Sequence, residues 1–282
     1  MTTERDNRVK TYNKFSILTI ERAHDSNIDS DINQDNEESD ISSNNKSVRK
    51  KRMHKPNRKH VITITLNLFS TNGAGVIGGK VSSLKAQVKL VNANVVAIQE
   101  THARRKGRIQ IPEMVVFEAI RKAKGGGTLI ASHKSLNPRL IESYEDEFEL
   151  LVVELELKEK KIRMISGYGP QENWTEEKRR PFFIALETEV EKASLAGKSV
   201  IIALDANAKL GKKYIPEDTH EISPNGTILA DIVERQGIVV GNGTSICKGT
   251  TTRTRTTRNR TEKSAIDFLM VSSDLKRIYC QL

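Results

Sequence analysis

The chain has 282 residues and a formal net charge of +10, with 37% hydrophobic and 29% charged residues. This length allows one large domain or two small ones, and the hydrophobic content allows a core that does not extend over the whole chain. The two cysteines, Cys247 and Cys280, fit neither a disulfide framework nor a zinc motif and suit a reducing compartment, nuclear or cytoplasmic. No apolar run approaches the length of a membrane-spanning helix.

The first sixty residues have strongly segregated charge. Residues 23–40 contain seven acidic and no basic side chains, and residues 41–60 contain eight basic and no acidic side chains. Neither stretch has an apolar period, so residues 1–60 are predicted to be a disordered, acidic-then-basic tail. The folded domain is expected to span residues 61–282.

Residues 61–282 are basic in their own right, with 33 Lys or Arg against 26 Asp or Glu. A basic folded domain favours a polyanionic partner such as nucleic acid. A basic surface that serves only solubility explains the same charge, so the partner has to be argued from the motifs.

Beyond residue 60 the apolar patterns predict strands interleaved with a few helices. A β-branched run at 61–66 predicts a first strand that ends at Asn67. Helical spacing is found at 80–91, 176–193 and 225–236. Further strands are predicted at 95–98, 128–132, 148–157, 161–168, 199–204, 238–241 and 265–271. Because strands dominate and hairpins mix with crossovers, the pattern favours sheets packed together with helices outside.

Polar residues stand where several of these strands end. Asp205 and Asn207 follow strand 199–204, and at positions i and i+2 both side chains can point to the same side. An aspartate there can accept a proton from water and an asparagine can donate to a charged oxygen, although Asp-x-Asn is also common turn chemistry. Glu100, in Gln99-Glu100-Thr101, is either a ligand for a hard cation or a cap for a turn.

Two further side chains interrupt apolar or glycine-rich stretches. Asp267 lies within the apolar run 265–271, and because a buried carboxylate is costly unless paired, a functional role such as orienting a histidine is favoured. Tyr168 lies between Gly167 and Gly169, so it is presented at a turn. Its hydroxyl could bind a phosphate, or its ring could border the core.

The segment 248–263 holds six basic side chains and one acidic side chain, with Thr and Arg in alternation. This pattern predicts an extended hairpin with a basic face beside Asp267. Arginine and threonine both contact phosphates, so four arginines are candidates for nucleic-acid contacts: Arg253, Arg255, Arg258 and Arg260. The alternative is an exposed polar hairpin without a ligand.

Taken in order, these motifs resemble the endonuclease/exonuclease/phosphatase superfamily. That superfamily includes apurinic/apyrimidinic endonucleases, enzymes of the DNase I type and the endonuclease domains of non-LTR retrotransposons. The resemblance extends from Val61 to the C-terminus, and the Gln99-Glu100-Thr101-His102 form is similar to the retrotransposon members. It implies a four-layer α/β/β/α sandwich, in which two mainly antiparallel sheets lie face to face and helices cover their outer faces.

The resemblance also implies roles for single residues. Asn67 and Glu100 would hold Mg²⁺, for which Mn²⁺ could substitute, and Tyr168 would contact the phosphate. Asp205 and Asn207 would activate water and stabilise the pentacovalent phosphate. Asp267 would orient a catalytic histidine, yet none of the six histidines follows Asp267. The domain is therefore expected to be truncated at its C-terminus, with its last strand left as an unprotected sheet edge.

The implied function is a Mg²⁺-dependent phosphodiesterase, with a DNA endonuclease of retrotransposon origin favoured. One alternative is a phosphodiesterase of the same fold that acts on RNA or on another phosphoester. A second alternative is a non-catalytic, nucleic-acid-binding remnant of such a domain, in agreement with the missing histidine. The sequence leaves these alternatives and the oligomeric state open.

Overall fold

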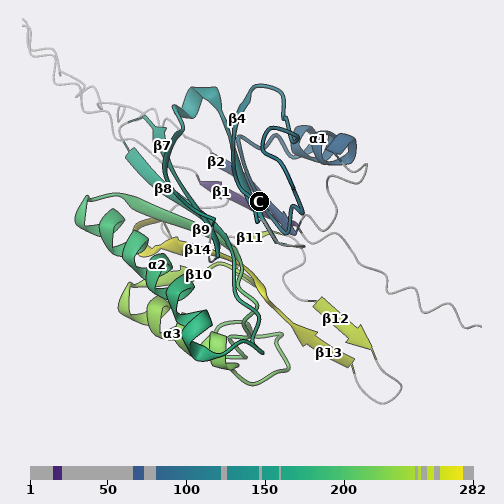
Figure 1. Cartoon of the computed structure of the whole chain (residues 1–282), viewed down its shortest axis with the longest axis vertical. Helices are drawn as coiled ribbons and strands as arrows, with labels where there is room; N and C mark the ends of the chain where they lie inside the picture. Colours follow the sequence, from purple (N-terminus) through teal and green to yellow (C-terminus); the bar gives the residue numbers. More distant parts are fainter. Residues whose placement is uncertain are drawn as a thin grey trace, which may run out of the picture. The chain divides into compact units, whose positions relative to one another are not determined.

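A computed structural model describes residues 15–20, 66–72, 81–121, 126–145, 148–158, 160–244, 247–248, 253–256 and 261–275. In these parts of the chain the strands form two six-stranded sheets and a separate two-stranded hairpin (Figure 1). The first sheet has the order β11-β1-β2-β3-β5-β4, with β1 (Phe15–Ile20), β2 (Leu66–Asn72), β3 (Val95–Gln99), β4 (Met114–Ala119), β5 (Thr128–His133) and β11 (Cys247–Lys248).

The second sheet has the order β10-β14-β9-β8-β7-β6. Its strands are β6 (Arg139–Tyr144), β7 (Glu149–Leu157), β8 (Lys160–Tyr168), β9 (Ser199–Asp205), β10 (Ile238–Val240) and β14 (Asp267–Ser272). The hairpin consists of β12 (Arg253–Thr256) and β13 (Thr261–Ser264), and two short 3-10 turns, η2 (Lys134–Leu136) and η3 (Ser273–Leu275), follow β5 and β14.

Alternating side chains build the layers on both faces of each sheet. On β9, Ile201 and Ala203 face the first sheet, whereas Val200, Ile202 and Leu204 face the helices. The helices are α1 (Val81–Leu90), which packs on the outer face of the first sheet, and α2 (Glu176–Leu195) and α3 (Pro224–Arg235), which pack on the outer face of the second (Figure 1). The predicted α/β/β/α sandwich is confirmed.

The start of α3 fixes the loop that follows β9. Ser223 caps the helix, because its Oγ accepts a hydrogen bond from the Gly226 N–H at 3.2 Å, and Pro224 occupies the first turn, where a missing N–H does no harm. Lys209 N–H also donates to the Ser223 Oγ at 2.9 Å. The helix cap therefore holds the chain four residues beyond the end of β9.

No helix among the described residues is long and apolar enough to cross a membrane.

The N-terminal region contributes a strand to the first sheet. β1 pairs antiparallel with β2 from Phe15↔Thr71 to Ile20↔Leu66, and it also pairs with β11. The prediction of a disordered tail over 1–60 is therefore wrong for these six residues, and the rest of that tail lies outside the described residues. The pattern missed β1 because its partners are far away in the sequence, and pairing across a sheet overrides local composition.

Removing β1 is expected to destabilise the domain. A chain without residues 1–21 would expose the edge of β2 and lose the strand that joins β2 to β11, so its melting temperature should fall and its aggregation should increase. The matched control is a chain without residues 1–14, which keeps β1. Equal melting temperatures for the two truncated chains, measured by circular dichroism, would contradict a structural role for β1.

The last strand lies inside its sheet. β14 is paired on one side with β10 and on the other with β9, in antiparallel register with both. The expectation of an unprotected edge at β14 is therefore wrong, because the short strand 238–240 covers that side. The position of β14 brings Asp267 next to Asp205 across the sheet.

Candidate active site

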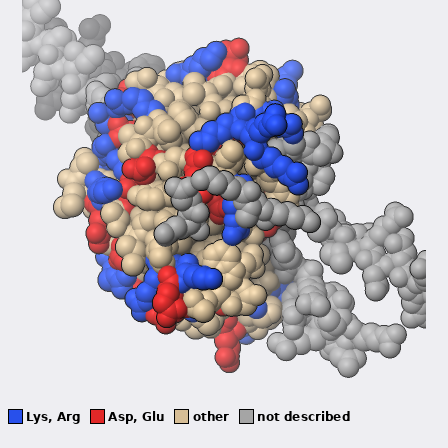
Figure 2. Space-filling model, viewed as in Figure 1, with Lys and Arg blue, Asp and Glu red and all other residues tan. Residues whose placement is uncertain are grey.

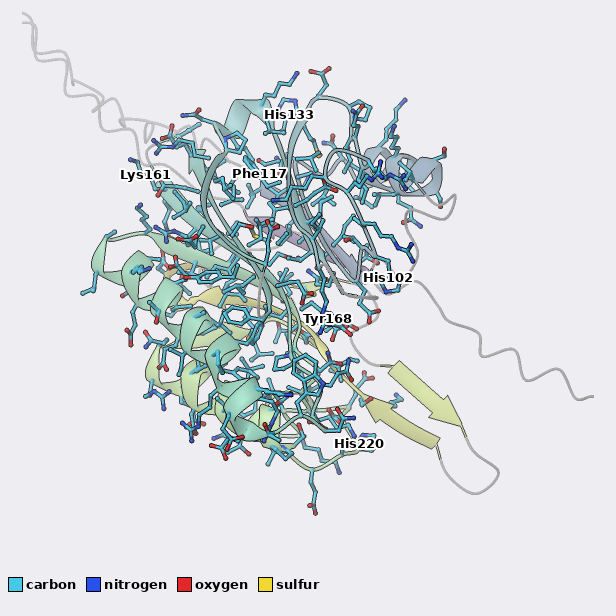
Figure 3. The ribbon with its side chains drawn as sticks, in the orientation of Figure 1. His102, Phe117, His133, Lys161, Tyr168 and His220 are labelled. Carbon is cyan, nitrogen blue, oxygen red and sulfur yellow. The ribbon has the colours of Figure 1, made fainter. Side chains whose placement is uncertain are left out.

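Four neighbouring strands of the second sheet carry polar side chains at the same level. The register pairs Glu149 with Tyr168, Tyr168 with Asp205, and Asp205 with Asp267. The residues two positions away from these four on the same strands line or border the core between the sheets: Leu151, Ser166, Ala203 and Leu269. By alternation, the four polar side chains also point toward the first sheet, at the end where β8 and β9 finish. Figure 3 marks Tyr168 at this end, and Lys161, near the start of the same strand, at the other.

The first sheet adds Glu100 to this end of the sandwich. The side-chain amide of the preceding Gln99 donates to the Ser166 Oγ at 3.0 Å and to the Ala203 carbonyl at 3.2 Å, which joins β3 to β8 and β9. Glu100 itself has φ 53°, in the left-handed region. A non-glycine residue in this region is strained, and such residues gather at functional sites.

The pKa of the Tyr168 phenol depends on the neighbouring side chains of the site. Its pKa is raised to about 12, first by burial and next by the carboxylate charge of Glu100, with a smaller contribution from Asp205, while a hydrogen bond from Asn207 opposes the rise. Gln171 Nε2 also donates to the Tyr168 hydroxyl at 3.0 Å. The phenol therefore keeps its proton at neutral pH and can donate a hydrogen bond to an anion.

Asp205 and Asn207 form a turn that joins the ends of β8 and β9. The Asn207 N–H donates to Asp205 Oδ1 at 3.2 Å, and Asn207 Nδ2 donates to the Gly169 carbonyl at 2.8 Å. Asn207 has φ 43°, again in the left-handed region. A Cβ at Gly169 would lie 2.5 Å from the Ala206 carbonyl oxygen, so glycine is required for this close approach. The Asp-x-Asn turn is present, and it also brings Asp205, Asn207 and Tyr168 together.

Two buried asparagines hold the loops around this turn. Asn225 Nδ2 donates to the carbonyl oxygens of Pro170 and Asn207, at 2.8 and 3.0 Å. Asn242 Nδ2 donates to the Asp267 carbonyl at 2.8 Å, and its Oδ1 accepts from Leu269 N–H at 2.9 Å. Sequence reasoning missed both; the signal was an asparagine beside glycine in each case, in Pro224-Asn225-Gly226 and Gly241-Asn242-Gly243.

Sequence reasoning also missed Glu149, the fourth of the polar residues that are paired across β7, β8, β9 and β14. Its side chain is 3% exposed, and Arg121 Nε lies 3.4 Å from Glu149 Oε1. Burial raises the pKa of the Glu149 carboxyl, and the positive charge of Arg121 opposes that rise. A Cβ at Gly126 would lie 2.8 Å from the same oxygen, and the Gly126 carbonyl accepts the His102 N–H at 2.9 Å. Glu149 therefore supports the segment that follows Glu100.

The structure contradicts the prediction for Asn67. β2 runs parallel to β3 with Leu68 opposite Val95 and Asn72 opposite Gln99, so Asn67 lies at the far end of the strand from Glu100. The Asn67 N–H donates to Asn94 Oδ1 at 2.9 Å, and its Nδ2 donates to the Asn92 carbonyl at 3.2 Å. The prediction was wrong because the strand extends to Asn72, whose backbone is the one beside Gln99.

The predicted Thr/Arg hairpin forms, with Arg253 opposite Ser264 and Arg255 opposite Glu262. Arg258 and Arg260 lie outside the described residues. The loop before α3 holds the base of the hairpin: Thr219 N–H donates to the Lys263 carbonyl at 2.9 Å, and Ala265 N–H donates to Asp218 Oδ2 at 3.4 Å. His220 also contacts this base, because its Nδ1 lies 3.3 Å from Asp218 Oδ1 and 3.1 Å from the Lys263 carbonyl oxygen.

The donor set of the site fits a hard cation better than a soft one. Within the described ranges, no group of three or more His, Cys, Asp or Glu side chains is arranged to hold a metal ion. Mg²⁺ takes one or two carboxylates and leaves its other positions to water and phosphate. Glu100 with φ 53° beside the Tyr168 phenol, and Asp205 next to Asp267, supply carboxylates of the kind that Mg²⁺ uses.

A pocket opens beside the turn. It has a volume of about 290 Å³ and is lined by Gln171, Glu172, Asn173, Asn207, Ala208, Lys209 and Ile266. It lies between the segment after β8 and the segment after β9, so a ligand in it would contact Asn207.

The fold is similar to that of two solved nucleases. The endonuclease domain of TRAS1, a telomere-specific non-LTR retrotransposon, is 16% identical, with a TM-score of 0.50 over 73% of this chain and 85% of that one. The AP endonuclease LMAP from Leishmania major is 15% identical, with a TM-score of 0.56 over 73% of this chain and 78% of that one. No protein-family profile and no curated protein sequence matches the chain. These similarities establish a DNase I-like fold, as in the endonuclease/exonuclease/phosphatase superfamily.

Proposed function

We propose that this chain is a Mg²⁺-dependent phosphodiesterase that acts on nucleic acid, as a DNA endonuclease. The observation that carries the proposal is the meeting of Glu100, Tyr168, Asp205 and Asn207 at one end of the two sheets. A carboxylate for a cation, a carboxylate for water and two neutral hydrogen-bond donors are the groups that hydrolysis of a phosphodiester needs.

Each side chain has a role that its chemistry supports. Glu100 would hold Mg²⁺, which when bound neutralises charge on the phosphoryl oxygens. Asp205 would accept a proton from the attacking water, and its orientation is fixed by the Asn207 N–H at 3.2 Å. Tyr168 and Asn207 would donate to phosphate oxygens. Asp267 lies opposite Asp205, and two neighbouring carboxylates favour a bound cation.

Nucleic acid is the favoured substrate because the folded region is basic. Residues 61–282 have 33 basic and 26 acidic side chains, and Lys and Arg side chains are spread over the face shown in Figure 2. Arg253 and Arg255 belong to β12 and would contact the phosphate backbone. The similarity in fold to a retrotransposon endonuclease domain supports DNA.

A substrate comparison tests the proposal. The purified chain is incubated with supercoiled plasmid, single-stranded RNA and a small phosphodiester, each with Mg²⁺ and with EDTA. We expect nicking of the plasmid with Mg²⁺ and none with EDTA. Faster cleavage of RNA or of the small phosphodiester would favour another substrate class. DNA binding without hydrolysis of any substrate would identify a non-catalytic remnant.

A further inference from the structure

The loop between β3 and β4 carries a dense group of positive charges close to the candidate active site. Arg104, Arg105, Lys106 and Arg108 fall within five consecutive positions, and all four are exposed. Figure 2 shows Lys and Arg side chains gathered on the part of the surface where Figure 1 places β4 and α1. This group belongs to none of the roles given above.

The loop is anchored to the domain on its inner side. Ala103, Ile109 and Ile111 are 3%, 0% and 5% exposed, and the two isoleucines pack in the core beneath α1. At its start, Thr101 N–H donates to the Gly127 carbonyl at 3.2 Å. At its turn, Gly107 has φ +80° and its N–H donates to Glu118 Oε2 at 2.5 Å. A loop held in this way loses little backbone conformational entropy when its cations bind a ligand, so the entropy cost falls mainly on the side chains.

Most of these cations are not neutralised by the domain itself. Lys106 Nζ pairs with Glu145 at 2.5 Å, and the Glu118 carboxylate accepts the Gly107 N–H. Among the described residues no ion pair is found for Arg104, Arg105 or Arg108. Three arginines with no ion-pair partner among the described residues, on an anchored loop, suit a ligand that carries several neighbouring negative charges.

The position of the loop relates it to the reacting phosphate. Arg104 is four residues from Glu100, so their Cα atoms are at most about 14 Å apart, from the length of an extended chain. A nucleic-acid strand rises about 3.4 Å per nucleotide, so this distance corresponds to about four nucleotides. A strand whose phosphate lies at Glu100 would therefore pass within reach of the arginines.

We propose that the loop 101–113 is a phosphate-binding arm that contacts the nucleic-acid backbone near the hydrolysed bond through Arg104, Arg105 and Arg108, with Arg104 within about four nucleotides of that bond. The proposal rests on the proposed function for the position of the reacting phosphate. Arginine suits this task because its planar guanidinium can make two hydrogen bonds to one phosphate. Such contacts fix the position of the strand without reading its sequence.

The test is the salt dependence of DNA binding, measured in EDTA so that no hydrolysis occurs. The probe is a short fluorescein-labelled DNA duplex, and its affinity is measured by anisotropy over a series of KCl concentrations. Each lost phosphate contact should lower the slope of log affinity against log salt by about 0.9, so Arg104→Gln/Arg105→Gln should lower it by about 1.8. Arg104→Lys/Arg105→Lys keeps both charges and should restore most of the slope.

The charge-matched control is Lys158→Gln/Lys161→Gln. Both lysines are exposed, with Lys158 in the turn before β8 and Lys161 near the start of β8, at the opposite end of the strand from Tyr168. This control should leave the slope unchanged. An unchanged slope in the Arg104→Gln/Arg105→Gln variant, or an equal loss in the control, would overturn the proposal. Failure of the proposed function is read separately, as absence of Mg²⁺-dependent hydrolysis by the wild type.

Discussion

Replacement of Asp205 by Asn is expected to slow Mg²⁺-dependent hydrolysis by about 100-fold to 10,000-fold, the usual contribution of a general base. The change removes the ability to accept a proton while keeping the size of the side chain. The Asp205 side chain is 2% exposed, and the oxygen of the new amide can still accept the hydrogen bond that the Asn207 N–H makes to Asp205 Oδ1 at 3.2 Å. The turn should therefore persist, and the melting temperature should change little compared with the rate.

The measurement is the initial rate of plasmid nicking, with Asp231→Asn as the matched control. Asp231 is an exposed residue of α3, and its replacement removes the same charge away from the site. We expect the control to cleave at the wild-type rate. If Asp205→Asn also kept the wild-type rate, Asp205 would not be the general base and the assignment of the site would be wrong.

Replacement of Glu100 by Gln is expected to abolish the stabilisation of the domain by divalent cations. A ligand that binds only the folded state stabilises it by about 2.7 kcal/mol at a concentration 100 times its dissociation constant. Mg²⁺ or Mn²⁺ should therefore raise the melting temperature of the wild type, and EDTA should reverse the rise. The Gln side chain lacks the negative charge that a hard cation requires, so the variant should show little rise.

Glu172→Gln is the control for this comparison. Glu172 is exposed and lines the neighbouring pocket, so it tests whether any acidic residue near the site produces the effect. The control should be stabilised by the cation as much as the wild type. Equal shifts in the wild type and in Glu100→Gln would remove Glu100 from the metal site.

Local sequence patterns predicted packed sheets with helices outside, because the central strands are short β-branched and apolar runs, and the family resemblance implied the four-layer sandwich. The strands that end at Gln99, Tyr168 and Asp205 can each be recognised from their own residues, and the polar side chains of the site lie at or next to their ends. The catalytic and binding roles of Glu100, Tyr168, Asp205, Asn207 and Asp267 stay predictions, as do those of the hairpin arginines.

Features that depend on contacts between distant segments were not predicted. β1 was missed because its partner strand begins at Leu66, and Asn67 was misplaced because pairing with β3 extends β2 to Asn72. Glu149 was missed although it interrupts the alternation of its strand, because it shares a face with the buried Leu151 and Val153 and not with Glu154. Its place in the site follows from the cross-strand register with Tyr168, which no local pattern contains.

The central claim is that Glu100 and Asp205, which come from different sheets, act in one site on one phosphate. The measurement that tests it most directly is a double-mutant cycle on Mg²⁺-dependent plasmid nicking, with Glu100→Gln, Asp205→Asn and the variant that combines them. Residues that act as a unit give losses that do not add in free energy, so the double variant should be about as slow as the slower single variant. Rate losses that multiply in the double variant would show that the two carboxylates act independently and would contradict the claim.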